Sequence, residues 1–217
     1  MNDMSTSLSS LQIMLLDQCF KFEKHHLGSA FSTLPILKEI FDLKRAEDKV
    51  VLSNGHAAAA LYVCLEEYSG VDSSTLFSLM GDHPKRSDEY GVDCSTGSLG
   101  MGITVAVGMA LASPAKNIYC VISDGECAEG AVWEAIRFAA SRKLENLKIF
   151  VNINNYIAYD KIDGEKLAKE ILFLNQEIKV RFTTVFPFED LGLTAHYFKM
   201  DQNKYNEVRK ILCASNS

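Results

Sequence analysis

The sequence lacks the basic surplus by which nucleic-acid-binding proteins are recognised. Its 217 residues include 22 Lys plus Arg against 28 Asp plus Glu, which gives a formal net charge of −6. Neutralising phosphates requires a clustered basic face, whereas the basic pairs at 44–45, 85–86 and 142–143 are scattered along the chain. We therefore expect no nucleic-acid partner.

The six cysteines do not have the spacing of a disulfide framework or a zinc site. They lie far apart, with no C-x-x-C pair among them. Cys64 and Cys120 lie inside apolar runs, where a free cysteine behaves as a small hydrophobic residue. We expect reduced structural thiols, and hence a cytoplasmic protein.

Long apolar runs are also missing. The longest, Met101 to Ala112, falls well short of the roughly 20 residues that span a bilayer. The N-terminal segment has neither a basic region nor a small-residue cleavage site, so we expect no signal peptide and no membrane role. With 47% hydrophobic and 23% charged residues, the composition is typical of one globular domain over residues 1–217.

Apolar runs alternate with helical periodicity in the middle of the chain. Residues 49–53, 118–122 and 147–153 read as buried strands, while 57–68 and 131–141 show helical spacing. Continuous apolar strands alternating with helices predict an α/β fold, a doubly wound, mostly parallel sheet with helices on both faces. Further helices are expected over 7–24 (capped by Ser5 or Ser7), 33–43 (with Pro35 in its first turn), 98–112, 164–176 and 202–213, and strands over 183–186 and 196–198.

Polar residues follow each of the three predicted strands. Residues 54–56 (Asn-Gly-His), 124–126 (Asp-Gly-Glu) and 152–155 (Asn-Ile-Asn-Asn) occupy these positions. Ligands of open parallel sheets bind outside the carboxyl ends of the strands, so one crevice could collect all three segments. Asp, Gly and Asn are also ordinary turn residues, and for each loop alone the two interpretations are equally weighted.

Asp124 and Asn154 form the strongest candidate site. One carboxylate and one amide oxygen on neighbouring strands, with a nearby carbonyl, provide hard oxygen ligands. Mg²⁺ commonly takes one or two carboxylates and leaves its other positions to phosphates and water. No G-x-x-x-x-G-K-[ST] loop occurs, which argues against a P-loop nucleotide enzyme.

Two further features have alternative interpretations. Gly97, Gly100 and Gly102 open a helix of small residues, which could pack tightly against another backbone or contact a ligand with its first turn. The histidines at 25, 26, 56 and 83 lie in predicted loops or at helix starts. They could be solvated side chains, or groups that bind hydroxyls and move protons near neutral pH.

Several of these segments resemble, in order, the motifs of the N-terminal, diphosphate-binding part of transketolase, over about residues 20–165. The similar segments are 24–29 (KHHLGS), 52–57 (LSNGHA), 94–102 (CSTGSLGMG), 106–110 (AVGMA), 124–130 (DGECAEG) with 133–135 (WEA), and 142–147 (RKLENL) leading to Asn154.

The resemblance implies a site for thiamine diphosphate and Mg²⁺, or Ca²⁺ or Mn²⁺ in its place. By similarity, the metal would be bound by Asp124, the Asn154 side chain and the Tyr156 carbonyl. Gly125 and Glu126 would border the diphosphate. The remaining expected roles are cofactor contact by Gly97, Ser98 and Leu99, substrate contact by His26, His56 and His83, and, for Glu129, a carboxylate network between two active sites.

The same resemblance implies transfer of a two-carbon ketol unit from a ketose to an aldose. The pyrimidine-binding and C-terminal domains of the family have no counterpart among these motifs. We therefore expect the N-terminal subunit of a split enzyme, with a separate pyrimidine-binding subunit in an α₂β₂ heterotetramer and with sugar or sugar-phosphate substrates. The alternatives are the α subunit of a 2-oxo-acid dehydrogenase, or a non-catalytic remnant that only binds partners. Ser123, Asn152 and Leu27 depart from the family's usual Gly, Asp and Pro.

Overall fold

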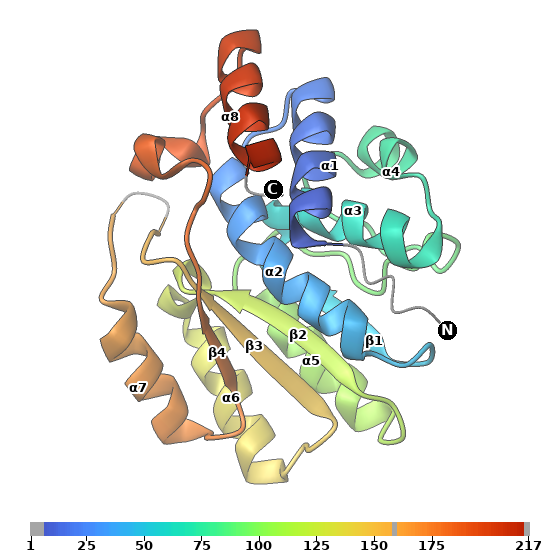
Figure 1. The fold of residues 1–217 in the computed structure, drawn as a ribbon. Coiled ribbons are helices and arrows are strands. Elements are labelled where there is room, and N and C mark those ends of the chain that lie inside the picture. Colours follow the sequence, from blue (N-terminus) through green and yellow to red (C-terminus); the bar gives the residue numbers. More distant parts are fainter. Residues whose placement is uncertain (1–6, 158–159, 215–217) are drawn as a thin grey trace.

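The fold is built on one parallel sheet, in a computed structural model that describes residues 7–157 and 160–214. Its strands are β1 (Lys49–Leu52), β2 (Ile118–Ser123), β3 (Leu147–Ile153) and β4 (Lys179–Phe182), in the order β1-β2-β3-β4 (Figure 1). Val51 pairs with Cys120, and Cys120 pairs with Ile149 in the next strand. All three carboxyl ends that were expected to carry polar residues therefore meet at one edge.

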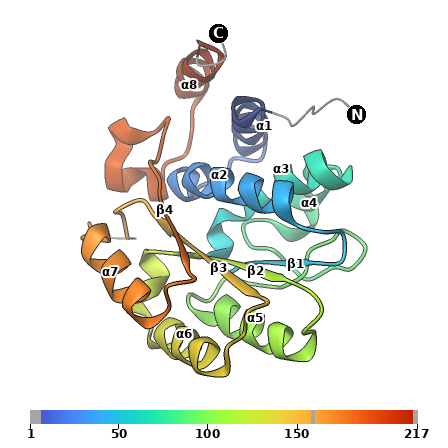
Figure 2. The ribbon, with the colours of Figure 1, turned by 60° about the horizontal axis from the view of Figure 1, so that its bottom comes forward.

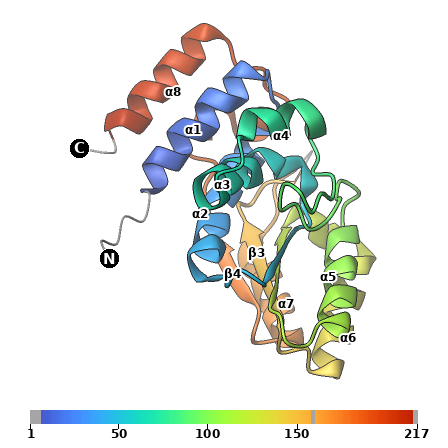
Figure 3. The same ribbon diagram turned by 90° about the vertical axis from the view of Figure 1, so that its right-hand side faces the viewer.

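Helices cover both faces of this sheet. Figure 2 shows α5 (Met101–Ala112), α6 (Gly130–Arg142) and α7 (Gly164–Leu174) on one face, with α2 (Leu27–Leu43) and α3 (Ala58–Ser69) on the other. Beyond α2 and α3, α1 (Leu8–Lys21) lies beside α8 (Gln202–Ala214), and α4 (Ser73–Met80) follows α3 (Figure 3). Three short 3₁₀ segments, η1 (Gly55–Ala57), η2 (Gly125–Ala128) and η3 (Glu189–His196), complete the fold. The predicted fold class is confirmed.

The two faces of the sheet contribute to two separate hydrophobic cores. Val50 and Val121 pack with the helices of one face, whereas Val51, Cys120 and Ile149 pack with α5, α6 and α7. Successive side chains of a strand point to opposite faces, so a strand covered on both sides must be apolar at every position. This explains why β1 to β3 were visible in the sequence as unbroken apolar runs.

One prediction about the N-terminal half needs correction and another is confirmed. The second helix was expected over 33–43 with Pro35 in its first turn, but α2 begins at Leu27 and Pro35 lies in its interior. Its first turn has Gly28, and a Cβ there would lie 3.2 Å from Cγ1 of Val185. Close packing therefore favours a glycine in this turn although glycine is a weak helix former. Of the two suggested caps of α1, Ser7 accepts from the backbone N–H of Ser10, and Ser5 lies outside the described residues.

The predicted strands over 183–186 and 196–198 are wrong. The fourth strand is β4, four residues earlier, and the second of these segments falls at the end of η3 and in the turn after it. β4 lies at the edge of the sheet and alternates polar and apolar residues. Its Arg181 bonds Glu39 of α2 through two nitrogens at 2.9 and 2.7 Å. A partly exposed edge strand lacks the continuous apolar run by which the central strands were recognised.

Two of the expectations from composition, those about the cysteines and the apolar runs, can be compared with the structure. All six cysteines are free thiols, five of them buried and Cys213 exposed. Among residues 7–157 and 160–214, no helix has the length and hydrophobicity that a membrane crossing requires.

Asp48 connects the start of β1 with the turn before β2. Its buried carboxylate accepts from the Arg45 guanidinium at 2.7 and 3.2 Å and from the Asn117 backbone N–H at 2.8 Å. Burial raises the pKa of this carboxyl, but these hydrogen bonds outweigh it and hold the pKa well below the usual 3.8.

We predict that Asp48→Ala lowers the free energy of unfolding at neutral pH by about 1–3 kcal/mol, because buried donors lose their acceptor. The contribution of a carboxylate with a lowered pKa is complete above its unfolded pKa and is lost as the pH falls below about 3.8. Urea unfolding at several pH values should therefore show that the difference in unfolding free energy between the wild type and Asp48→Ala becomes smaller at acidic pH. Asp88→Ala, at an exposed position, should change stability by less than about 0.5 kcal/mol.

Candidate active site

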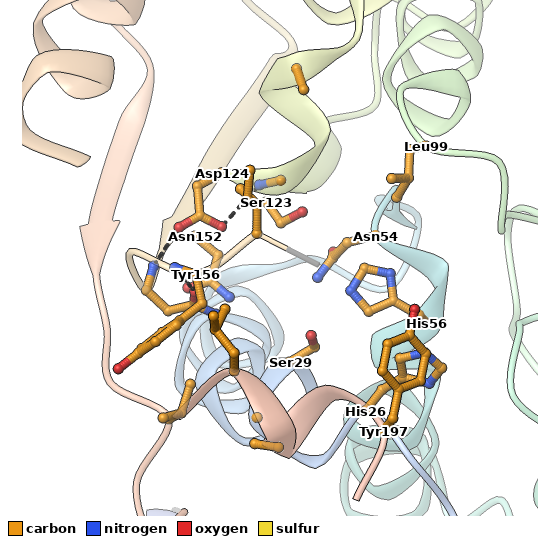
Figure 4. Close-up of a pocket in the computed structure, with 18 of the residues that line it drawn as sticks. His26, Ser29, Asn54, His56, Leu99, Ser123, Asp124, Asn152, Tyr156 and Tyr197 are labelled. Carbon is orange, nitrogen blue, oxygen red and sulfur yellow. Dashed lines mark hydrogen bonds between the residues drawn. The ribbon is translucent and has the colours of Figure 1, made fainter. Parts of the chain in front are cut away.

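A cavity of about 460 Å³ lies at the carboxyl edge of the sheet. Figure 4 shows Asp124 and Tyr156 on one side of it and His26, His56 and Tyr197 on the other. The complete lining comprises His26, Gly28, Ser29, Asn54, His56, His83, Gly97, Leu99, Ser123, Asp124, Gly125, Ala128, Glu129, Asn152, Asn154, Tyr156, Ile157, Val185, Gly192, Leu193, Ala195 and Tyr197. Ten predicted site residues are thus brought together.

Asp124 lies where β2 ends and η2 begins, and it is only 1% exposed. Its Oδ2 accepts from the backbone N–H groups of Asn154 and Asn155, both at 2.9 Å, and its Oδ1 accepts from Gly125 at 3.0 Å. A carboxylate has about four lone-pair positions, so these three bonds leave Oδ1 able to accept one more partner. That remaining position is available for a cation at the cavity.

Asn154 and Tyr156 follow the end of β3, the strand that pairs with β2. The Asn154 Oδ1 accepts from the backbone N–H of Tyr156 at 2.9 Å, and its Nδ2 donates to Ser32 Oγ at 3.1 Å. This arrangement folds the backbone back toward Asp124, which bonds the Asn154 N–H. Hydrogen bonds therefore hold together the two loops, after β2 and after β3, that carry the three predicted metal ligands.

The electrostatics of this end of the cavity favour a cation. Burial raises the pKa of Asp124 from 3.8 to about 6, although hydrogen bonds from backbone N–H groups, with that of Asn154 the largest, act in the opposite direction. No lysine or arginine occurs among the described residues that line the cavity. Within the described part of the chain, no group of three or more His, Cys, Asp or Glu could hold a metal. A cation here would need the amide and carbonyl oxygens together with ligands from a bound molecule.

Three histidines lie at the other end. His26, the residue before α2, has left-handed backbone angles (φ 59°, ψ 32°), and its ring centroid lies 5.4 Å from that of His56. Backbone strain of this kind in a residue other than glycine is concentrated at functional sites. His83 lies against the backbone of Gly97, where a Cβ would be 3.0 Å from its ring. Because Gly97 has no side chain, the loop that carries it can contact the loop that carries His83.

The first turn of α5 is packed against the protein. A Cβ on Gly102 would lie 2.5 Å from the Ser53 Cα, and one on Gly100 would lie 2.9 Å from the Glu129 Cβ. The N–H of Gly100 donates to Glu126 at 2.9 Å, and that of Ile103 donates to Ser53 Oγ at 3.2 Å. Of the two interpretations of this glycine-rich helix, the structure supports tight packing of its start.

Two predicted cofactor contacts lie outside the cavity lining. Glu126 was expected to border the diphosphate, but its fully buried carboxylate accepts from Ser53 Oγ (2.7 Å) and from the N–H groups of Gly100 and Ser123. Burial raises the pKa of Glu126, and the hydrogen bonds from Gly100, Ser53 and Ser123 offset only part of this effect. Ser98 is exposed and also does not line the cavity.

The cavity lining also includes residues to which the sequence analysis gave no individual role in the site. Ser29 lies in the first turn of α2, and Asn54 is buried with an Oδ1 that has no partner among the described residues. Val185 and Tyr197 come from the segment around η3, where the motif resemblance fades. Ser29 and Asn54 lie within motifs that the sequence analysis had identified, and Asn54 was expected at the crevice. Nothing in the local pattern predicted that the distant segment around η3 also lines the cavity.

Comparisons with known proteins show the family of this chain. The family model "Transketolase, thiamine diphosphate binding domain" matches residues 4–184. The chain is 32% identical to the 6-deoxy-6-sulfo-D-fructose transketolase subunit SqwG of Clostridium sp. (strain MSTE9), over 75% of this chain and 65% of that protein. It is 39% identical to the transketolase of Pongo abelii, over 49% of this chain and 19% of that protein.

Solved structures show the same fold. The transketolase of Campylobacter jejuni superposes with a TM-score of 0.75 at 23% identity, covering 97% of this chain and 43% of that chain. The transketolase of Leishmania mexicana gives a TM-score of 0.67 at 17% identity, covering 97% of this chain and 45% of that chain. The present chain thus spans less than two thirds of each of these relatives. Because the family model covers most of its length, the protein belongs to the transketolase family and contains that family's thiamine diphosphate-binding domain.

Proposed function

We propose that this chain is the cofactor-binding subunit of a two-chain, Mg²⁺-dependent enzyme that transfers a two-carbon ketol unit from a ketose to an aldose. The observation that carries the proposal is the single cavity that joins the oxygen ligands of Asp124, Asn154 and Tyr156 to three histidines. The family membership supports it, and it favours the transketolase reaction over that of a 2-oxo-acid dehydrogenase.

The residues of the cavity fit thiamine diphosphate and a divalent cation. Asp124 is a buried carboxylate with one lone pair left, and Asn154 Oδ1 accepts a single described hydrogen bond. Without lysine or arginine in the described lining, a diphosphate requires a metal ion to neutralise it. Mg²⁺ suits one carboxylate, neutral oxygens and phosphate ligands. Asp124, Asn154 and the Tyr156 carbonyl would hold the metal, and Gly125 would lie beside the diphosphate.

The histidines have the chemistry that the sugar substrates need. When bound, thiamine diphosphate supplies the electron sink for the transferred two-carbon unit. His26, His56 and His83 can donate hydrogen bonds to sugar hydroxyls and move protons near neutral pH. Leu99 and the wall formed by Val185 and Ala195 limit water around these groups. The protein contribution is therefore orientation of the sugar and proton transfer.

The proposal of a partner subunit rests on the name of one relative. The Clostridium relative carries the name of a transketolase subunit, and we propose a separate chain that supplies the pyrimidine-binding half here as well. Its name also supports sugars with an anionic group as the substrate class. Purified chain should show ketose-to-aldose transfer only when such a subunit is added. Full turnover by the chain alone would contradict the two-chain arrangement.

Two copies of this chain are proposed to meet through α5 in an α₂β₂ assembly. Met101, Val105 and Leu111 are exposed on that helix, beside small residues that permit close approach. Burying such a stripe on a two-fold axis makes a self-complementary contact. We predict that Val105→Glu converts the dimer of this chain to a monomer in analytical ultracentrifugation. Phe173→Glu, at a more exposed position on α7, should leave the dimer intact, and an unchanged Val105→Glu dimer would exclude α5 as the interface.

Cofactor binding should depend on pH through Asp124. Its raised pKa of about 6 means that the folded chain takes up a proton as the pH falls below that value, and a metal ligand must be deprotonated. We predict that Mg²⁺-dependent affinity for thiamine diphosphate is constant above pH 7 and falls by up to about tenfold per pH unit below pH 6. The free energy of unfolding of the cofactor-free chain should change in the opposite direction. The folded state binds the proton of Asp124 more tightly than the unfolded state, so this residue adds stability as the pH falls from about 6 toward 3.8. Calorimetry and urea unfolding across this range measure both effects.

A further inference from the structure

The buried hydroxyl of Ser32, on α2, contacts two asparagine side chains at the proposed metal site. Ser32 is 1% exposed, and its Oγ accepts from Nδ2 of Asn152 at 3.0 Å and from Nδ2 of Asn154 at 3.1 Å. The Ser32 hydroxyl donates to the Ser29 carbonyl at 3.2 Å. The side-chain amides of Asn152 and Asn154 therefore both donate to the Ser32 oxygen, while the Ser32 proton is used in the bond to the Ser29 carbonyl.

The contact with Ser32 determines which atom Asn154 turns toward the cavity. The side-chain amide has two ends, and the backbone N–H of Tyr156 donates to one of them at 2.9 Å. If the amide were rotated by half a turn, Nδ2 would face that N–H and Oδ1 would face an oxygen that already donates to Ser29. Two contacts thus fix Oδ1 as the atom available to a metal, with Ser32 holding the opposite end.

We propose that Ser32 is a positioning residue for the metal ligand Asn154, which it holds in the orientation that presents Oδ1 to the cation. This inference rests on the proposed function only in requiring a metal at Asp124 and Asn154. Hydrogen bonds to the far side of a ligand commonly change metal affinity by about 10- to 100-fold. Ser32 does not line the cavity, so it acts through the asparagine.

The neighbouring residue Thr33 provides a matched control. Its Oγ1 accepts from Nδ2 of Asn152 and from Nδ2 of Asn54, both at 3.1 Å, and it is as fully buried as Ser32. Asn152 bonds both hydroxyls, whereas the amide nitrogen of Asn154 bonds Ser32 alone among the described acceptors. Removal of the Ser32 or the Thr33 hydroxyl takes a hydrogen-bond acceptor away from buried amide groups. Only removal of the Ser32 hydroxyl takes away the acceptor of the Asn154 amide nitrogen.

The test measures binding of Mn²⁺ to the full chain in the presence of thiamine diphosphate, by electron paramagnetic resonance. Ser32→Ala should raise the Kd of Mn²⁺ by at least about tenfold. Thr33→Val should leave it within about threefold of the wild type, while both variants lose similar stability in urea. Ser32→Cys provides a second variant of nearly the same shape, and because sulfur is a weak acceptor it should raise the Kd in the same direction.

The outcomes separate this inference from the proposed function. A wild-type chain that binds Mn²⁺ normally, with an unchanged Kd in both Ser32 variants, overturns the positioning role alone. An equal rise in Kd in the Ser32 and Thr33 variants also overturns it, because the effect would then come from general destabilisation. A wild-type chain that binds no Mn²⁺ overturns the proposed function and this inference with it.

Discussion

Replacement of Asp124 by alanine is expected to abolish Mg²⁺-dependent binding of thiamine diphosphate. Asp124 provides the only negatively charged group among the three proposed metal ligands, and hydrogen bonds join its carboxylate to the loop that carries the other two. A Mg²⁺ site with so few protein ligands cannot retain its metal when the charged one is removed. Because no described lysine or arginine lines the cavity, the diphosphate then has no permanent positive charge to bind.

The measurement is thermal unfolding with and without Mg²⁺ and thiamine diphosphate. Cofactor at 100 times its Kd stabilises a folded chain by about 2.7 kcal/mol, which for a protein of this size corresponds to roughly 5–10 °C in Tm. The wild type should show this increase and Asp124→Ala should not.

The cofactor-free variant should also be less stable than the wild type. Asp124 and Asn154 are only 1% and 8% exposed. Loss of the carboxylate leaves three backbone N–H groups without an acceptor, at a cost of about 1–3 kcal/mol. Release of a buried charge with a raised pKa offsets part of this cost. A normal cofactor-induced increase in Tm in Asp124→Ala would show that the metal lies elsewhere.

Replacement of His56 by alanine should lower kcat/KM by about 10²-fold or more, with thiamine diphosphate affinity nearly unchanged. His56 lies at the end of the cavity opposite Asp124, beside His26 (Figure 4). Loss of a positioned acid or base typically costs 10²- to 10⁴-fold in rate. The same result is expected for His83, which lies against Gly97.

His25 provides the matched control for this experiment. It is adjacent to His26 in the chain, but it is exposed and does not line the cavity. His25→Ala should therefore retain kcat/KM within about threefold, a change of less than 1 kcal/mol in transition-state stabilisation. An equal loss of cofactor affinity in His56→Ala would assign that histidine a structural role.

The sequence predicted best those parts of the site that follow the central strands. Asp124 and Asn154 are thirty residues apart, yet β2 and β3 are paired neighbours in register, so their carboxyl ends had to meet. The apolar runs identified these strands because both faces of the sheet are covered. Burial on two sides is thus what made this half of the cavity visible in the sequence.

The sequence could not show which way a polar side chain points. Glu126 lies two residues after Asp124, yet its carboxylate turns into the protein to bond Ser53 and Gly100. A residue in a strand-to-helix turn can face either the ligand or the helix beneath it, and only the contacts of distant residues decide. The wall contributed by Val185 and Tyr197 was missed for a related reason, because it depends on long-range packing of η3.

The most direct test of the central claim is calorimetric titration of the purified chain with thiamine diphosphate, in saturating Mg²⁺ and again in EDTA. The account predicts one cofactor site for each chain, with an affinity at least about tenfold higher in Mg²⁺, because the metal supplies the positive charge that the cavity lacks. Equal affinity in Mg²⁺ and in EDTA, or no binding in either, would contradict a metal-linked cofactor site at Asp124 and Asn154.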